Sequence, residues 1–226
     1  MNTRFTRSQG CILFDLDGTL LDSAPDIVGA ANELFTAYNK PSLSMEQLRP
    51  ITGEGTIVFL EAGFGYKPAE AEYKKLRGEL FEIYYNRNNV DSILFDGIEA
   101  ILTSLNEQKL PWGIVTNKPE HLTTPLLDKF SILQTSGVLV CADTLAKAKP
   151  HPEPIWHACK ILNRKPESSI YIGDHERDVI AGKAAGLFVV AALYGYIPDL
   201  ELAKLWPADL FVDSVDEIAK FIERSI

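Results

Sequence analysis

The sequence predicts an α/β fold, a doubly wound parallel sheet with an inserted α-helical domain, on three observations. Short apolar runs recur along most of the chain, without the polar alternation of strands that have one face in water. Amphipathic stretches of helical length lie between these runs, and this alternation is typical of a doubly wound sheet. One block, roughly Pro25 to Asn89, breaks the alternation, because its patterns are all helical.

Six short apolar runs are expected to form the strands of the sheet. Runs of this kind suit strands that are buried on both faces by helices. They are Cys11–Phe14, Trp112–Thr116, Gly137–Cys141, Ile170–Gly173, Leu187–Ala191 and Leu210–Val212. The helices expected between and after them are Ile98–Gln108, His121–Lys129, Glu153–Leu162, Arg177–Ala185 and Val215–Arg224.

The helical block is expected to be a separate cap domain. We place the cap at residues 23–92 and the α/β core at residues 1–22 and 93–226, with linkers near Leu20–Ala24 and Asn89–Asp96. Prolines and glycines divide the block into four expected helices, Ile27–Tyr38, Met45–Leu48, Thr56–Ala62 and Ala69–Tyr85.

The charge balance and the cysteines exclude several classes of protein. The 226 residues carry 22 Lys and Arg against 31 Asp and Glu, a net charge of −9, whereas nucleic-acid binders usually show a basic excess. No apolar run approaches the roughly 18 residues of a membrane span. The three cysteines lie far apart without metal-site spacing, and an odd number in a chain of this size favours reduced thiols over a disulfide framework. We therefore expect a cytoplasmic monomer or homodimer without nucleic-acid or membrane partners.

Two carboxylates, Asp15 and Asp17, follow the first predicted strand. Ligands of open parallel sheets bind outside the carboxyl ends of the strands, so both side chains are placed for chemistry. Side chains two apart on a strand point the same way, which would crowd the carboxylates unless a cation or a bend separates them. Gly18 permits a tight turn and a close approach of the backbone to a ligand.

Three later segments add further polar groups. Thr116 and Asn117, at the end of the second predicted strand, can hydrogen-bond phosphate oxygens, and Lys149 supplies an ammonium ahead of a helix. Asp174 and Asp178, at the end of the fourth strand and in the next helical turn, suit a hard divalent cation such as Mg²⁺. Taken singly, each group also has an ordinary structural explanation as a turn, a helix cap or a solvated loop residue.

In this order, the four segments resemble the four motifs of the haloacid dehalogenase-like (HAD) superfamily. The resemblance covers essentially the whole chain, and the helical block stands where the family carries its C1-type cap. Val115–Pro119, Lys149–Pro154 and Asp174–Gly186 are similar to the phosphoglycolate phosphatase branch. The resemblance implies a HAD-like Rossmannoid core and an Mg²⁺-dependent hydrolase of phosphomonoesters that works through an aspartyl phosphate.

The resemblance also implies a role for each motif residue. Asp15 would be the nucleophile, Asp17 the general acid and base, Thr116 a ligand of the phosphoryl group, and Lys149 a balancing charge. Mg²⁺ would be held by Asp15, the Asp17 main-chain carbonyl and Asp174, with Asp178 in support. The groups expected to bind substrate are Gly18, Thr19 and Asn117 and, in a turn similar to the cap loop of the branch, Gly53, Glu54 and Gly55.

The resemblance leaves the substrate open among small phosphorylated metabolites. It favours 2-phosphoglycolate, with N-acetylmuramic acid 6-phosphate as the main alternative and a β-phosphoglucomutase-like phosphotransfer as a less favoured one. Asp17 and Asp174 argue against haloacid dehalogenase activity, because dehalogenases use no Mg²⁺ and lack the second aspartate of the first motif. A phosphorelay receiver is disfavoured, because receivers are much shorter and have no helical cap.

Overall fold

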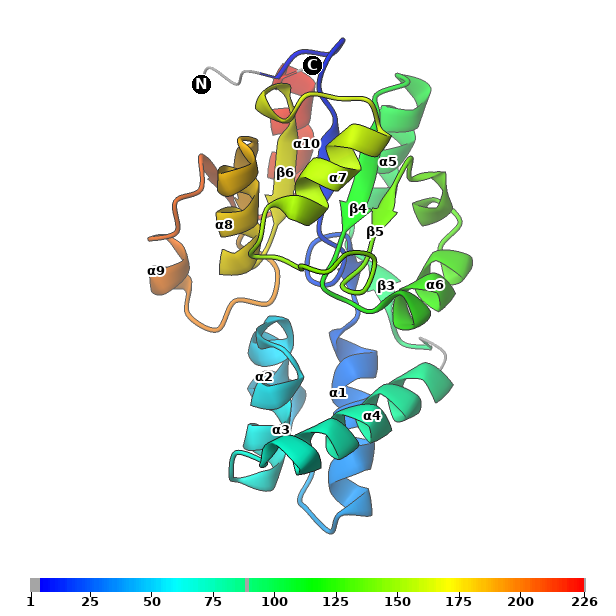
Figure 1. The fold of residues 1–226 in the computed structure, drawn as a ribbon, viewed down its shortest axis with the longest axis vertical. Coiled ribbons are helices and arrows are strands. Elements are labelled where there is room, and N and C mark those ends of the chain that lie inside the picture. The colour runs from blue at the N-terminus through cyan, green and yellow to red at the C-terminus, as the bar shows by residue number, and fades with distance from the viewer. Residues whose placement is uncertain (1–4, 88–89, 226) are drawn as a thin grey trace. The chain divides into compact units, whose positions relative to one another are not determined.

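The computed structural model describes residues 5–87 and 90–225, which form two compact units (Figure 1). Unit 1 comprises the chain up to Leu21 and from Leu94 onward, and unit 2 spans Asp22–Ile93. The predicted second linker begins at Asn89, which lies outside the described residues.

A six-stranded parallel sheet forms the centre of unit 1, and it confirms the predicted fold class. Its order is β5-β4-β1-β6-β7-β8, so the first strand of the chain lies inside the sheet. The strands are β1 (Ile12–Phe14), β4 (Trp112–Val115), β5 (Leu139–Val140), β6 (Ile170–Gly173), β7 (Phe188–Ala192) and β8 (Leu210–Val212). Phe14 is in register with Ile114 and Ile172, so the carboxyl ends of β1, β4 and β6 meet at one edge.

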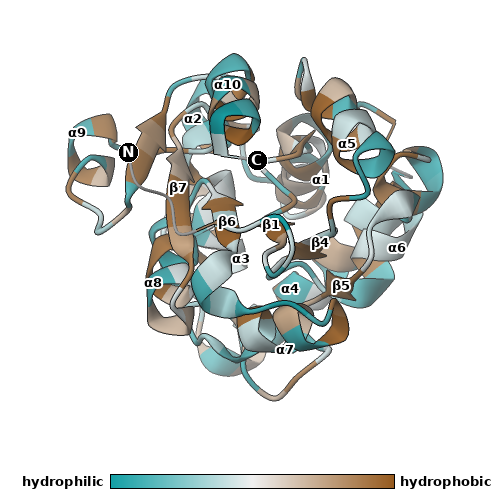
Figure 2. Ribbon diagram, turned by 90° about the horizontal axis from the view of Figure 1, so that it is seen from above, coloured by the Kyte–Doolittle hydropathy of each residue, from teal (hydrophilic) through white to brown (hydrophobic). Residues whose placement is uncertain are grey.

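Helices cover both faces of the sheet. Successive strand residues point to opposite sides, and because both sets are apolar, both faces need to be buried. On one face, Ile12 and Phe14 pack with the apolar sides of α5 (Ile98–Glu107) and α10 (Val215–Ser225). On the other, Leu13 packs with α7 (Glu153–Ile161) and α8 (Glu176–Ala185). Figure 2 shows the apolar strands between these two pairs of helices. Burial on both faces explains why the strands read as continuous apolar runs.

The predicted elements of unit 1 all form, and the structure adds several short elements, two of which, β2 (Leu21–Asp22) and β3 (Ile93–Leu94), lie where the chain passes from one unit to the other. α6 spans Glu120–Lys129 and is the remaining predicted helix. The elements without a sequence prediction are β2, β3, α9 (Leu200–Ala203), and the 3-10 helices η2 (Leu133–Thr135) and η3 (Pro166–Ser168). β2 and β3 pair in a separate two-stranded sheet. Elements this short contain too few residues to show a periodic pattern.

Unit 2 is built from helices, and none of the residues from Ala24 to Arg87 is in a strand. Its elements are α1 (Ala24–Ala37), α2 (Met45–Leu48), η1 (Arg49–Glu54), α3 (Thr56–Phe64) and α4 (Glu70–Asn86). α1 begins three residues before the predicted Ile27, because Pro25 suits the first helical turn. α3 runs to Phe64 and ends at Gly65, whose φ of 75° is the left-handed conformation common after helices.

A buried aspartate ties together the two ends of unit 2. Asp26 is fully buried, and its Oδ2 accepts hydrogen bonds from the Ser92 amide at 2.7 Å, the Ser92 hydroxyl at 2.6 Å and the Asp91 amide at 3.1 Å. Its other oxygen lies 3.6 Å from Nε of Arg87. The start of α1 is therefore fixed to the segment in which the chain leaves unit 2.

None of the described helices is both long enough and apolar enough to cross a membrane.

Replacement by alanine is expected to change the free energy of unfolding in opposite directions at two glycines inside helices. A Cβ on Gly182 of α8 would lie 2.6 Å from Cγ2 of Val189, so Gly182→Ala should destabilise the protein by about 1–3 kcal/mol through overpacking. Gly78 of α4 has open space around the same position, so Gly78→Ala should stabilise it by about 0.5–1 kcal/mol through helix propensity. Urea unfolding followed by circular dichroism measures both, and equal effects of the two substitutions would contradict the described packing.

Candidate active site

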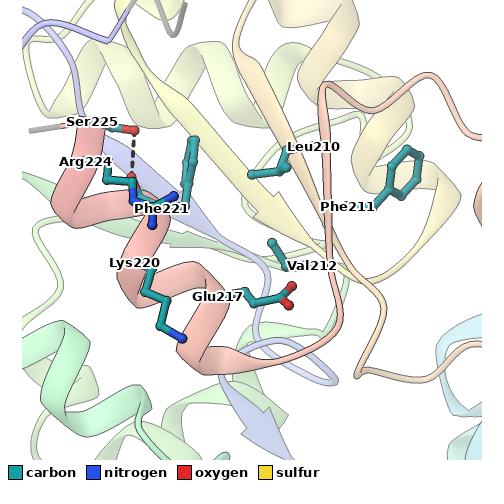
Figure 3. A pocket seen from close by; sticks show the side chains of 8 residues that line it. All are labelled: Leu210, Phe211, Val212, Glu217, Lys220, Phe221, Arg224 and Ser225. Carbon is teal, nitrogen blue, oxygen red and sulfur yellow. Dashed lines mark hydrogen bonds between the residues drawn. The ribbon is translucent and has the colours of Figure 1, made fainter. Parts of the chain in front are cut away.

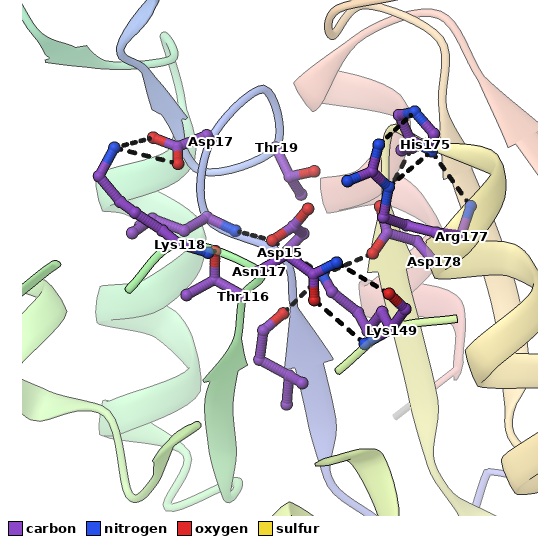
Figure 4. A network of polar contacts seen from close by, with 12 residues as sticks. Asp15, Asp17, Thr19, Thr116, Asn117, Lys118, Lys149, His175, Arg177 and Asp178 are labelled. Atoms are coloured by element: carbon purple, nitrogen blue, oxygen red, sulfur yellow. Dashed lines mark hydrogen bonds and ion pairs between the residues drawn. The ribbon is translucent and has the colours of Figure 1, made fainter. Parts of the chain in front are cut away.

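The predicted core residues of the site come together at the edge where β1, β4 and β6 end (Figure 4). Asp15 follows β1, Thr116 follows β4 and Asp174 follows β6. Lys149 comes from the loop before α7, and Asp178 lies in the first turn of α8. The parallel register thus collects groups that lie far apart in the sequence.

A compact turn after β1 separates the first two carboxylates. The Leu16 carbonyl accepts hydrogen bonds from the amides of Leu20 and Leu21 at 2.9 and 3.0 Å. Gly18 has a φ of 81°, a conformation that L side chains rarely adopt. The bend directs Asp15 and Asp17 to different partners, which resolves the crowding expected for neighbouring carboxylates on a straight strand.

Lys149 lies at the centre of the site with its ammonium fully buried. Its Nζ is 3.0 Å from Oδ1 of Asp15 and 2.6 Å from Oδ1 of Asp178. It also donates hydrogen bonds to the Val115 carbonyl at 2.8 Å and to the Tyr171 hydroxyl at 2.9 Å. Oxygen atoms from four segments of the chain therefore surround one positive charge.

The amide of Asn117 holds the backbone of this lysine. Asn117 Nδ2 donates to the Lys149 carbonyl at 2.9 Å, and the Lys149 amide donates back to Asn117 Oδ1 at 3.1 Å. The side chain expected to help bind phosphate thus orients the catalytic lysine candidate. The predicted contact of Asn117 with substrate stays a prediction.

Asp174 is held by groups of the first motif and of the loop after β7. Its Oδ1 accepts from the Thr19 hydroxyl at 2.9 Å, and its Oδ2 accepts from the Tyr196 amide at 2.8 Å. A Cβ on Gly18 or on Gly195 would collide with this carboxylate. Thr19 is fully buried, so its hydroxyl serves Asp174 here, and the expected role of Thr19 and Gly18 in binding substrate stays a prediction.

Asp178 has two functions in the fold. Its Oδ2 accepts from the His175 amide at 3.1 Å, as in a capping box at the start of α8. Its Oδ1 pairs with Lys149 and accepts from the Tyr171 hydroxyl at 3.2 Å. The helix cap fixes the carboxylate that faces the lysine.

Burial and mutual repulsion shift the pKa values of the cluster. Burial raises the pKa of Asp15 to about 6, with a further rise from the charge of Asp178, while Lys149 opposes the shift. Burial also raises the pKa of Asp174 well above its ordinary value, and the charges of Asp15 and Asp178 add to the rise. Burial alone would lower the pKa of Lys149, but the Asp15 and Asp178 carboxylates outweigh it and raise that pKa.

Among the described residues, Asp15, Asp174 and Asp178 form a set that fits a metal ion. One carboxylate oxygen of each lies within 4.8 Å of the others. All three donors are hard oxygen ligands, which suit Mg²⁺ better than a soft-ligand metal. The single ammonium of Lys149 cannot balance three ionised carboxylates, and a divalent cation would relieve the mutual repulsion that adds to burial in raising the pKa values of Asp15 and Asp174.

Asp17 lies outside this cluster and pairs with a different lysine. Lys118 Nζ is 3.2 Å from both carboxylate oxygens of Asp17. Figure 4 shows this pair on one side of the site and the Asp15–Lys149–Asp178 cluster on the other. Thr116, which is 4% exposed, accepts a hydrogen bond from the Lys118 amide at 3.2 Å through its hydroxyl.

The predicted substrate turn belongs to unit 2. Gly53 and Glu54 lie in η1, and Gly55 precedes α3 with a φ of 99°. A Cβ on Gly55 would meet no atom within 4 Å, so its conformation rather than crowding calls for glycine. Contact of these three residues with substrate stays a prediction.

Two residues of the site, Tyr171 and Lys118, were not predicted from the sequence to belong to it. Tyr171 is a polar-tipped residue in an otherwise aliphatic buried strand, and a buried tyrosine hydroxyl usually has a hydrogen-bond partner. That signal could have placed it beside the cluster. Lys118 follows the Thr116–Asn117 motif directly, but no spacing rule links it to Asp17.

A pocket between β8 and α10 contains none of the predicted site residues (Figure 3). It is lined by Leu210, Phe211, Val212, Glu217, Lys220, Phe221, Arg224 and Ser225. Its mixed apolar and charged lining does not match the chemistry expected from the motifs.

Comparison with known proteins identifies relatives along nearly the whole chain. Residues 12–192 match the family described as haloacid dehalogenase-like hydrolase. A phosphoglycolate phosphatase of Xanthomonas campestris pv. campestris is 38% identical over 215 residues, which cover 95% of this chain and 96% of the relative. An N-acetylmuramic acid 6-phosphate phosphatase of Pseudomonas putida is 34% identical over 215 residues, with the same two coverages.

The fold agrees with these sequence matches. A crystal structure of a predicted phosphoglycolate phosphatase from Haemophilus somnus 129pt aligns with a TM-score of 0.83 and 27% identity. The alignment covers 98% of this chain and 100% of the other, so the similarity includes both units.

Removal of the central ammonium is expected to destabilise unit 1 strongly. Lys149→Met leaves the buried carboxylates of Asp15 and Asp178 without their cation, which costs about 3–5 kcal/mol. Lys149 lowers the pKa of Asp15, which means that it stabilises the ionised form of that carboxylate. The loss of stability in the variant should therefore shrink as the pH falls through about 6 and Asp15 takes up a proton.

Urea unfolding followed by tryptophan fluorescence measures this loss, since Trp112, Trp156 and Trp206 all lie in unit 1. The matched control is Lys204→Met, which breaks an exposed ion pair with Glu201 in the same unit and should leave the midpoint unchanged. An equal midpoint for the Lys149 variant and the wild-type protein would contradict the central role of the ammonium.

Proposed function

Because the chain belongs to the haloacid dehalogenase-like hydrolase family, we propose that it hydrolyses the phosphomonoester of a small metabolite through an aspartyl phosphate on Asp15. The observation that carries the proposal is that four charged side chains lie together at the edge where β1 and β6 end. They are Asp15, Lys149, Asp174 and Asp178. The two relatives compared above are named as phosphatases, and both matches run over nearly all of both chains.

Asp15 is proposed as the nucleophile. With a pKa of about 6, its carboxylate is mostly ionised at neutral pH and can attack phosphorus. The hydrogen bond from the Leu16 amide, at 2.7 Å, and the ion pair with Lys149 fix its orientation. Formation of a covalent intermediate divides the hydrolysis into two easier displacements.

Asp17 is proposed as the general acid and base. It would give a proton to the leaving alkoxide in the first step and take one from the attacking water in the second. Thr116 and the backbone amides after Asp15 would bind the phosphoryl oxygens, with Gly18, Thr19 and Asn117 forming or supporting this cradle. Phosphoryl transfer depends mostly on such positioning and on charge stabilisation.

Mg²⁺ is proposed as the cofactor, because the donor set consists of oxygen atoms only. Asp15, Asp174 and the main-chain carbonyl of Asp17 would hold it, with Asp178 in support through its place beside Lys149. When bound, the ion supplies positive charge beside the phosphoryl group and the carboxylates.

For the substrate we propose 2-phosphoglycolate. A phosphoglycolate phosphatase shows 38% identity, and the segments around Thr116, Lys149 and Asp174 are similar to that branch. N-acetylmuramic acid 6-phosphate is the second candidate, supported by a relative of 34% identity that carries this name. A β-phosphoglucomutase-like transfer uses the same groups and is the less favoured alternative. We propose a cytoplasmic enzyme, monomeric or homodimeric, without nucleic-acid or membrane partners.

Phosphate release from a panel of esters tests the function. We expect the highest kcat/KM with 2-phosphoglycolate, compared with N-acetylmuramic acid 6-phosphate and hexose phosphates, and no activity after EDTA treatment. Asp15→Asn should lower kcat by about 10⁴-fold or more, because it removes the nucleophile. Asp216→Asn, an exposed acid in the first turn of α10, is the control and should keep wild-type rates.

Each part of the proposal can fail separately in this panel. Full turnover by the Asp15 variant would overturn the covalent mechanism, and activity in EDTA would overturn the metal requirement. Sugar phosphate interconversion faster than phosphate release would identify a mutase.

The effect of Mg²⁺ on stability is expected to depend on pH. The pKa values of Asp15 and Asp174 are raised above their unfolded values, so the metal-free protein loses stability as the pH rises through about 6. Mg²⁺ competes with those protons, and its stabilising effect should therefore grow over the same range. The difference between urea midpoints in Mg²⁺ and in EDTA, followed from about pH 5 to about pH 8, measures the effect. A difference that does not grow with pH would show that these carboxylates do not bind the ion.

A further inference from the structure

A second buried lysine, Lys118, pairs with Asp17 and has no assigned function. Its side chain is 6% exposed, while that of Asp17 is 21% exposed. Its Nζ lies at the same distance, 3.2 Å, from the two carboxylate oxygens, so the ammonium faces the carboxylate as a whole. The two carboxylates that follow β1 thus have separate lysines, Lys149 for Asp15 and Lys118 for Asp17.

The backbone of Lys118 is fixed on both sides. Its amide donates to the Thr116 hydroxyl at 3.2 Å, and its carbonyl accepts from the Ala142 amide at 3.1 Å. The side chain therefore starts from a fixed point beside the phosphoryl-binding candidate Thr116. Because its backbone is anchored and its side chain is buried, Lys118 can hold the Asp17 carboxylate in one orientation.

Stability alone is a weak explanation for this pair. Burying two charges costs free energy that their attraction repays only in part, and apolar residues often serve a fold equally well. Asp17 is the group that must meet both the leaving oxygen and the attacking water. Restricting its carboxylate to one direction would reduce the cost of reaching that geometry in each step.

We propose that Lys118 is a positioning residue that orients the Asp17 carboxylate for proton transfer, an inference that rests on the proposed function of Asp17. Lys118 acts through Asp17 and forms no bond to the reacting phosphorus. Its loss therefore costs no more than the loss of what Asp17 contributes.

A double-mutant cycle tests this, using the ester that the wild-type protein hydrolyses fastest. Lys118→Met keeps the length of the side chain and removes its charge, and it should lower kcat by about 10²-fold with little change in KM. Lys118→Arg restores a cation and should recover part of the rate. Asp17→Asn should lower kcat by about 10²–10⁴-fold. The double variant should be no slower than Asp17→Asn alone.

The leaving group provides a second measurement. p-Nitrophenolate leaves without a proton, so formation of the aspartyl phosphate from p-nitrophenyl phosphate needs little help from Asp17. The burst of p-nitrophenol in the first turnover should therefore change little in Lys118→Met, while the corresponding step with an alkyl ester slows. Lys204→Met serves as the charge-matched control and should keep wild-type rates with both esters.

Three results would overturn the proposal. Additive losses in the double variant would show that Lys118 acts independently of Asp17. A rise in KM with unchanged kcat would show a direct contact with substrate. Equal slowing with both esters, together with a lowered urea midpoint, would show a role in the fold only. Failure of the proposed function itself would appear separately, as full activity of Asp15→Asn.

Discussion

The ammonium of Lys149 holds together the part of the molecule on which the chemistry depends. It contacts Asp15 after β1, the Val115 carbonyl of β4, the Tyr171 hydroxyl of β6 and Asp178 of α8. Without this charge, the carboxylates of Asp15 and Asp178 would repel each other in a buried environment. The parallel sheet brings the acidic groups together, and the positive charge of Lys149 offsets the repulsion between them when no metal ion is bound.

This arrangement also explains why the net charge of the protein says little about its substrate. The chain carries a formal charge of −9, and this net charge by itself disfavours the approach of a phosphate ester. Four of the carboxylates, Asp15, Asp17, Asp174 and Asp178, lie at the site, and two lysines oppose them there. A bound divalent cation would offset the negative charge that remains there, and the local field, not the net charge, decides which ligand binds.

The sequence predicts the regular elements and the motif residues well, because both leave local signals. The six apolar runs become six parallel strands, and Asp15, Thr116 and Asp174 lie at strand ends as expected. Contacts that join distant segments leave no such signal. The hydrogen bond from Thr19 to Asp174 and the pairing of Lys118 with Asp17 span 155 and 101 residues, and they depend on how strands are ordered in the sheet.

The insertion of unit 2 directly after β1 has a consequence for the order of folding. β1 lies inside the sheet, yet its partners β4 and β6 begin only at Trp112 and Ile170. During synthesis the apolar residues of β1 emerge before those of β4 and β6, and the helices of unit 2, whose contacts are local, can assemble in the interval. The nucleophile candidate thus follows a strand that is made before both of its partners in the sheet, so the site forms only after β4, β6 and α8 have been made.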